Sequence, residues 1–228
     1  MTLRDAIVFA GCFLFVAALA VAVGCSSHDP AMTTDMPFLE MDASPARPRP
    51  AATAYRPTPR PATGRSDWDA PRTSRAWRHI VMHHSATESG SAEKFDAMHR
   101  QRGWDELGYH FVITNGNGGP DGRVQVGSRW RKQKHGAHTG GTPGNEYNEH
   151  GIGVCLVGNF MTHSPSPAQL RSVTELTEYL AERYGISPGH ILAHKDAPNQ
   201  KTECCGRVFY AYVHSRLKQD VQRQLAGR

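Results

Sequence analysis

Apolar positions alternate or recur regularly from about residue 78 onward, and they divide this part of the chain into strands and helices. Short runs rich in β-branched residues at 78–84, 108–114 and 123–127 predict strands. The turn sequence NGNGGPDG at 115–122 separates the last two runs and predicts that they pair as a hairpin. Residues 152–160, IGVCLVGNF, are almost continuously apolar, as in a strand that is buried on both faces of a sheet.

Helices are predicted between these strands by apolar stripes with a period of about 3.6 residues. Residues 91–103 begin at a candidate N-cap, Ser91, and residues 166–185 and 208–225 carry longer stripes. The longer stripes consist of Leu170, Val173, Leu176, Leu180 and Tyr184, and of Tyr212, Val213, Leu217, Val221 and Leu225. With a short strand at 190–194, strands and helices alternate. This predicts an α/β fold, in which a central mixed β-sheet is flanked by helices in a single domain.

The N-terminal segment has the pattern of an export signal or a membrane anchor. Residues 7–24 form an unbroken apolar run that follows Arg4. The run ends in AVGCSS, which resembles a bacterial lipobox whose cysteine, here Cys25, is lipidated. Asp5 weakens the positive start of the segment, so a lipoprotein-type signal over 1–25 and an uncleaved anchor both stay open. In either case we expect an exported protein that is membrane-anchored in the cell envelope, such as a periplasmic or outer-membrane lipoprotein.

Composition separates this segment from the folded part. Residues 26–75 hold nine of the fifteen prolines and little apolar periodicity, which predicts a Pro/Arg-rich disordered tether. The folded domain is then expected at 76–228, which is long enough for one core. Eight arginines against two acids within 47–78 favour a polyanionic neighbourhood of membrane headgroups or wall polymers. No basic recognition element accompanies them, so we expect no nucleic-acid partner, and we expect a monomer.

Candidate metal ligands lie at the ends of predicted strands, where a rigid element ends and a loop begins. His83 and His84 end the first strand, His194 ends the last, and Cys204 follows ten residues later. Two imidazoles and one thiolate leave a tetrahedral position open for water, as at a catalytic Zn²⁺ rather than a structural one. Consecutive side chains of a strand point to opposite faces, so only one of the adjacent histidines can be a ligand.

Four segments in register resemble one enzyme family. They are IVMHHSAT, GWDELGYHFVI, GAHT…NEHGIGVCLVG and ILAHKD…TEC. Their order is similar to that of the zinc-dependent N-acetylmuramoyl-L-alanine amidases, which include phage lysozyme-type amidases and peptidoglycan recognition proteins. The resemblance covers essentially the whole folded part. It implies a zinc amidase domain that hydrolyses the amide between N-acetylmuramic acid and L-alanine, with peptidoglycan or muropeptides as substrate.

The resemblance also implies roles for individual positions. The zinc ligands would be His83, His194 and Cys204. His84 would lie on the other side of the strand, and Cys205 occupies a position where the family usually has proline. These two side chains are therefore expected to be neighbours of the site and not ligands.

The catalytic positions of the family match Tyr109 and Thr202. The Tyr109 phenol would hydrogen-bond the zinc water or the oxyanion, although an ordinary strand aromatic fits the same pattern. Some bacterial members have glutamate at the position of Tyr109, so Lys201 and Glu203 stay candidates for proton transfer.

Three further residues match the surroundings of the family's site. His138 and Asn148 correspond to positions lining the substrate groove, and a role in ordering their loop is the alternative. Asp196 is expected to support His194 or its loop, with a surface aspartate that caps a turn as the alternative.

Other functions fit the sequence less well. A peptidoglycan-binding module of the same fold would commonly have lost the third ligand, whereas all three are present here. A structural lipoprotein with a degenerate amidase domain is a further alternative. A serine hydrolase using Ser85 beside His84 is disfavoured, because adjacent strand residues face opposite ways and no nucleophile elbow surrounds Ser85.

Overall fold

The computed structural model describes residues 65–70 and 75–227 of the 228-residue chain. The predicted signal or anchor at 1–25 and most of the predicted tether lie outside these residues. Within the described part, no helix combines the length and the apolar character that crossing a membrane requires.

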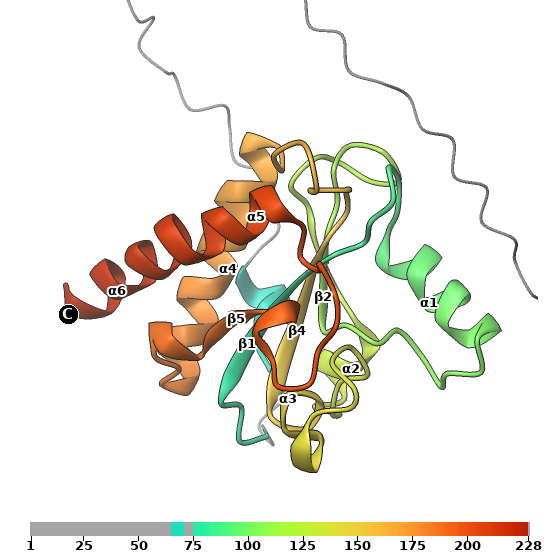
Figure 1. Cartoon of the computed structure of the whole chain (residues 1–228), viewed down its shortest axis with the longest axis horizontal. Helices are drawn as coiled ribbons and strands as arrows, with labels where there is room; N and C mark the ends of the chain where they lie inside the picture. The colour runs from blue at the N-terminus through green and yellow to red at the C-terminus, as the bar shows by residue number, and fades with distance from the viewer. Residues whose placement is uncertain (1–64, 71–74, 228) are drawn as a thin grey trace, which may run out of the picture. The chain divides into compact units, whose positions relative to one another are not determined.

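A mixed five-stranded sheet forms the centre of the molecule, in the order β3-β2-β4-β1-β5 (Figure 1). The strands are β1 (His79–His84), β2 (Phe111–Ile113), β3 (Val124–Val126), β4 (Gly151–Leu156) and β5 (Ile191–Ala193). β1 runs parallel to β4 and β5, and β2 runs parallel to β4 but antiparallel to its hairpin partner β3. The predicted α/β class with a central mixed sheet is therefore confirmed.

Helices cover both faces of the sheet. On one side lie α4 (Pro167–Tyr184), α5 (Arg207–Tyr212) and α6 (Lys218–Ala226), and α1 (Ala92–Gln101) lies on the other (Figure 1). Side-chain caps begin α4 and α1, and the cap at Ser91 was predicted from the sequence. Ser166 and Gln169 form a capping box at the start of α4, and the Ser91 hydroxyl accepts from the Lys94 backbone at the start of α1. Gly185, at φ 65°, ends α4 in the left-handed conformation that glycine adopts without strain.

Strand alternation decides which side chains face the main core. Ile80 and Met82 of β1 are fully buried in the cluster that includes α4, α5 and α6 residues. His83 therefore projects from the opposite face, where Cys155 of β4 is its partner in register. Cys155 belongs to a second, smaller apolar cluster that contains Phe95 of α1. His83 thus lies on the α1 face of the sheet, opposite the main core.

The C-terminal helix differs from the uninterrupted helix expected at 208–225. A π-helical turn, Val213–Leu217, joins α5 to α6. Its apolar residues are spaced by four, as in Val213, Leu217 and Val221, whereas an α-helix has 3.6 residues per turn. In an uninterrupted α-helix, side chains with this spacing would rotate gradually around the helix. The wider π turn compensates for this rotation. As a result, all three side chains stay buried on one side.

The packed domain begins before residue 76, earlier than the sequence predicted. Trp68, at the end of η1 (Arg65–Trp68), is only 2% exposed and belongs to the main core. Its backbone oxygen accepts a hydrogen bond from Trp130 Nε1 at 2.9 Å. The Tyr179 hydroxyl donates to Asp69 at 2.5 Å. This part of the predicted tether is therefore a folded arm, because its tryptophan fills a space in the core.

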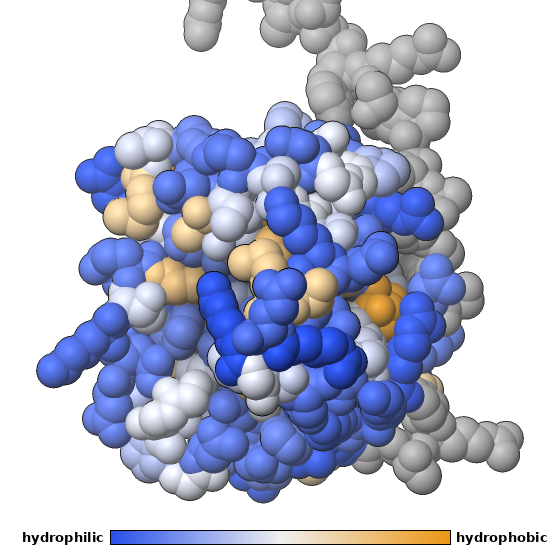
Figure 2. All heavy atoms as spheres, turned by 90° about the vertical axis from the view of Figure 1, so that its right-hand side faces the viewer, coloured by the Kyte–Doolittle hydropathy of each residue, from blue (hydrophilic) through white to orange (hydrophobic). Residues whose placement is uncertain are grey.

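The outer surface on the α1 side is mostly hydrophilic, with small separate apolar patches (Figure 2). Among the described residues, Trp104 is the large apolar side chain that is exposed, at 40%. Two short helices that the sequence did not predict are α2 (Ser128–Arg131) and α3 (Glu146–Glu149). They lie before and within the segment at 134–151, which we call the Gly- and His-rich loop. This loop connects β3 to β4 and contributes to the site described next.

Candidate metal centre

Three potential metal ligands meet where β1 and β5 end. His83 lies near the end of β1, and His194 begins the short helical turn η4 (His194–Asp196) directly after β5. Because these strands are parallel neighbours, their C-terminal ends lie side by side at the same edge of the sheet. Cys204 comes from the loop between η4 and α5. One donor atom from each of the three residues lies within 4.8 Å of the others, and Cys204 Sγ is 3.6 Å from His83 Nδ1.

The second nitrogen of each imidazole already has a hydrogen-bond partner. His83 Nε2 lies 3.2 Å from His138 Nδ1, and His138 Nε2 lies 3.2 Å from the Gly151 oxygen. A carbonyl oxygen only accepts, so His138 Nε2 carries the proton and its Nδ1 accepts from His83 Nε2–H. His194 Nε2 is 2.8 Å from Gln200 Oε1. Metal-ligating histidines typically donate their outer N–H in this way, which leaves the other nitrogen for the ion.

Burial sets the protonation of the metal-free site. Burial, together with the neighbouring histidines, holds the pKa of His83 well below its usual value, and burial lowers the pKa of His194. Burial raises the pKa of the Cys204 thiol to about 12. At neutral pH the site therefore holds two neutral imidazoles and a thiol. A cation that binds there must displace the thiol proton, as metal binding to cysteine generally does.

The two neighbours of the ligands point elsewhere. His84 Nδ1 accepts from the Phe160 backbone at 3.2 Å, on the main-core face of the sheet. Cys205 is fully buried in the main core. The structure therefore separates His83 from His84, and Cys204 from Cys205, as the strand alternation and the family pattern indicated.

Tyr109 and Thr202 both lie beside the three ligands. The ring centroid of Tyr109 is 5.2 Å from that of His83, and the Cys155 thiol is among the groups that raise the pKa of its phenol. Burial and the nearby thiols raise the pKa of Tyr109 well above its usual value, so its phenol stays protonated. Thr202 Oγ1 accepts from the backbone N–H of Cys204 at 3.1 Å, which holds the loop that presents the thiol.

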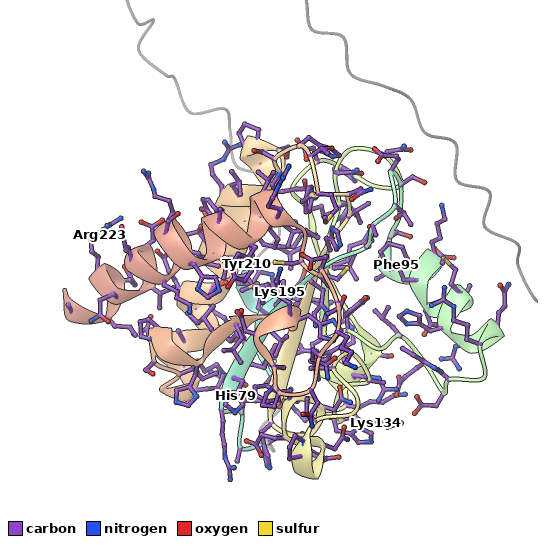
Figure 3. All side chains as sticks on the ribbon, in the orientation of Figure 1. His79, Phe95, Lys134, Lys195, Tyr210 and Arg223 are labelled. Atoms are coloured by element: carbon purple, nitrogen blue, oxygen red, sulfur yellow. The ribbon has the colours of Figure 1, made fainter. Side chains whose placement is uncertain are left out.

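The alternative candidates for proton transfer lie further out. Glu203 is largely exposed and pairs with Lys195 at 2.7 Å. Lys195 in turn lies over the Tyr210 ring, with Nζ 5.1 Å from the ring centroid (Figure 3). Lys201 is exposed. The Glu203 pair links the outer part of the ligand loop to α5.

His138 and Asn148 have contacts within the Gly- and His-rich loop. His138 is only 8% exposed and lies directly behind His83. Asn148 Oδ1 accepts from the backbone N–H groups of His138 and Thr139 at 2.8 and 2.9 Å. These contacts fit the alternative that the sequence left open, in which both side chains order their loop. His138 has the added effect of orienting His83.

Asp196 supports the turn that carries His194 through contacts with the backbone and with the C-terminal helix. Its Oδ2 accepts from the Ala193 backbone at 2.9 Å and from His214 Nε2 at 2.8 Å. Asp196 therefore caps this turn, which fits the alternative that the sequence left open, and joins it to the C-terminal helix. His79 lies far from the three ligands, because it begins β1 and His83 lies near the other end of that strand (Figure 3). The His79 ring hydrogen-bonds with Glu146 at 3.2 Å.

Comparison with known proteins agrees with this geometry. The sequence model of the N-acetylmuramoyl-L-alanine amidase family matches residues 73–207. The chain belongs to this family. The match includes all three candidate ligands and ends at the first residue of α5. The C-terminal helix that braces Asp196 through His214 therefore lies mostly outside the part that defines the amidase family.

Individual relatives carry two kinds of name. The N-acetylmuramoyl-L-alanine amidase of Sus scrofa is 33% identical over 131 residues, which are 56% of this chain but only 20% of the pig protein. Peptidoglycan recognition protein 1 of Bos taurus is 30% identical over 146 residues, 60% of this chain and 70% of the bovine one. The solved endolysine N-acetylmuramoyl-L-alanine amidase LysCS from Clostridium intestinale is 30% identical with a TM-score of 0.52, covering 63% of this chain and 86% of that one.

Two residues of the candidate site were not singled out from the sequence. Cys155 could have been found, because strand alternation in GIGVCLVG places it beside the ligand strand on the site's face. Gln200 lies in an irregular polar loop, and no periodicity or motif marks it. Its contacts become visible only when the loop is folded against Gly140.

Proposed function

We propose that the chain is a zinc-dependent amidase that cleaves the bond between N-acetylmuramic acid and L-alanine in peptidoglycan or muropeptides. The observation that carries this proposal is the convergence of His83, His194 and Cys204, with the outer nitrogen of each imidazole already hydrogen-bonded. Two nitrogens and one sulfur fit a zinc ion that keeps a fourth position for water or substrate. The family and the names of its members supply the class of bond.

A bound zinc ion would supply polarisation of the amide carbonyl and a nucleophile at neutral pH. The other tasks fall to the chain's own side chains. The Tyr109 phenol stays protonated, so it can donate a hydrogen bond to the carbonyl oxygen as negative charge develops there. Cys155, the partner of His83 in register on β4, lies near this phenol. Thr202 fixes the backbone of Cys204.

Zinc content and product analysis of the purified full chain test the proposal. We expect one zinc per chain and release of peptides with a free L-alanine amino terminus from purified peptidoglycan, identified by mass spectrometry. Cys204→Ser and His194→Ala should lose both zinc and peptide release. Cys205→Ala is the matched control, because it removes the adjacent thiol, which is buried in the core. Full release by either ligand variant, or equal loss in the control, would contradict the ligand assignment.

A non-catalytic peptidoglycan-binding module is the second candidate, because relatives such as the bovine protein are named as recognition proteins. The same measurements separate the two functions. A binding module would sediment with insoluble peptidoglycan without releasing peptides and without stoichiometric zinc. The intact set of three ligands favours hydrolysis.

We also propose that the protein is exported and tethered to a membrane. The apolar run at 7–24 and the lipobox-like Cys25 support this. In cells that express the full chain, we expect it in the membrane fraction. If Cys25 carries the lipid, Cys25→Ala should move the protein to the soluble fraction, whereas an uncleaved anchor should keep the variant membrane-bound.

A further inference from the structure

Gln200 contacts a metal-ligand candidate and the Gly- and His-rich loop at the same time. Its Oε1 is 2.8 Å from His194 Nε2, and its Nε2 is 2.8 Å from the Gly140 oxygen. Both distances are typical of good hydrogen bonds. The amide side chain therefore bridges two loops, one from each side of the candidate site.

The carbonyl groups around Gln200 fix the direction of its amide. Gly140 oxygen, and more distantly Pro198 oxygen at 3.4 Å, both face the side-chain nitrogen. Carbonyl oxygens only accept, so the NH₂ group must point toward them and Oε1 must point toward His194. A flipped amide would place two acceptors against each other on the Gly140 side.

This direction determines which nitrogen of His194 carries the proton. Gln200 Oε1 can only accept, so His194 Nε2 must donate to it. A neutral imidazole has one N–H, and its other nitrogen then presents a lone pair. The nitrogen left for the ion is therefore Nδ1, and its lone pair is available without a change of tautomer.

We propose that Gln200 is a positioning residue that selects the tautomer of His194 in which Nδ1 binds the metal, and that it ties this ligand to Gly140. The inference rests on the proposed function. Through Gln200, the Gly- and His-rich loop is linked to both histidines. His138 of this loop orients His83, and the Gly140 carbonyl orients His194 through Gln200. One loop thereby presets both imidazoles.

Two variants separate the bond to His194 from the bond to Gly140. Gln200→Leu removes both. Gln200→Glu keeps an oxygen acceptor for His194 Nε2–H but loses the donor to Gly140. Gln222→Leu is the matched control, because it makes the same change at an exposed position of α6. Far-UV circular dichroism and urea midpoints establish folding, and Gln200→Ala replaces the leucine variant if leucine is not tolerated.

The first measurement needs no metal. In the metal-free chain, ¹⁵N chemical shifts of the imidazoles report the tautomer, with the His194 signals assigned by their loss in His194→Ala. We expect a single Nε2–H tautomer in the wild type, in Gln200→Glu and in Gln222→Leu, and a mixture in Gln200→Leu. A single Nε2–H tautomer in Gln200→Leu would overturn the proposal.

The second measurement is zinc affinity, by competition with a chromophoric chelator. Loss of an outer-sphere partner costs about 10–100-fold in metal affinity, so the zinc Kd of Gln200→Leu should rise by that factor. Gln200→Glu should stay within a few-fold of the wild type, while amide exchange at Gly140 and Gly141 becomes faster. Wild-type zinc affinity in Gln200→Leu would overturn the proposal. A wild type that shows the expected tautomer but binds no zinc would instead overturn the proposed function.

Discussion

Replacing Trp68 tests whether the arm before residue 76 is part of the folded domain. Trp68 is 2% exposed and packs in the main core, with its ring 5.7 Å from that of Tyr179. Truncating a buried tryptophan to alanine typically costs about 3–5 kcal/mol, because the lost apolar contacts leave a cavity. The backbone oxygen that accepts from Trp130 Nε1 is kept in Trp68→Ala. Deleting residues 1–75 removes this acceptor too, and an unsatisfied buried donor adds about 1–3 kcal/mol.

Urea unfolding followed by far-UV circular dichroism gives both free energies without relying on tryptophan fluorescence. Since small domains are stable by only about 5–15 kcal/mol, Trp68→Ala should lower the midpoint strongly, and the deletion should lower it further. Trp104→Ala is the matched control, because this tryptophan is 40% exposed, and its cost should be at most about 1 kcal/mol. If Trp68→Ala cost no more than Trp104→Ala, the arm would not belong to the core.

Two further predictions concern acid stability and catalysis. Glu106 is 2% exposed; burial opposes its ionisation, but hydrogen bonds from Ser128, Lys132 and Lys134 prevail and lower its pKa to about 2. Its contribution to stability is therefore complete above the unfolded value of 4.5 and is lost as the pH falls toward 2, by at most about 3 kcal/mol. Urea unfolding at pH 5 and at pH 2.5 should show this loss, and Glu106→Gln should reduce it; an equal loss in the variant would contradict the assignment. Tyr109→Phe should keep zinc but lower kcat for muropeptide hydrolysis by about 10²–10³, as expected for loss of one oxyanion donor. Unchanged kcat in this variant would exclude the phenol from the reaction.

Much of the fold followed from apolar patterning, because each strand buries one face against a helical layer. Alternation in HIVMHH alone separates Ile80 and Met82, which face the main core, from His83. The short helices α2 and α3 were not predicted, because an element of four residues is too short to show a helical period in its apolar positions. The burial of Trp68 was not predicted for a different reason. Its surroundings have the composition of a tether, and its burial depends on Trp130, 62 residues further along the chain.

The candidate site was predictable to the extent that its residues follow strands. His83 and His194 come directly from β1 and β5, so the order of the sheet brings them together. The supporting contacts come instead from loops. His138 was expected either to line a substrate groove or to order its loop, and its ring nitrogens contact His83 and Gly151. Gln200 had no signal at all, because its partners, His194 and the Gly140 carbonyl, meet only after both loops are folded.

The fold should survive removal of the metal. His83 projects from the α1 face of the sheet, and the fully buried residues of the main core include none of the three ligands, although Cys204 packs against that core. Without metal, the site holds two neutral imidazoles and a thiol, since the pKa of Cys204 is about 12, so no like charges repel one another. A chelator should therefore leave the far-UV spectrum unchanged. Stability should fall only by the free energy of metal binding, about 2.7 kcal/mol when free zinc had been at 100 times its Kd. Collapse of the fold on chelation would show that the ion is a structural element and that the sheet alone does not hold the ligands in place.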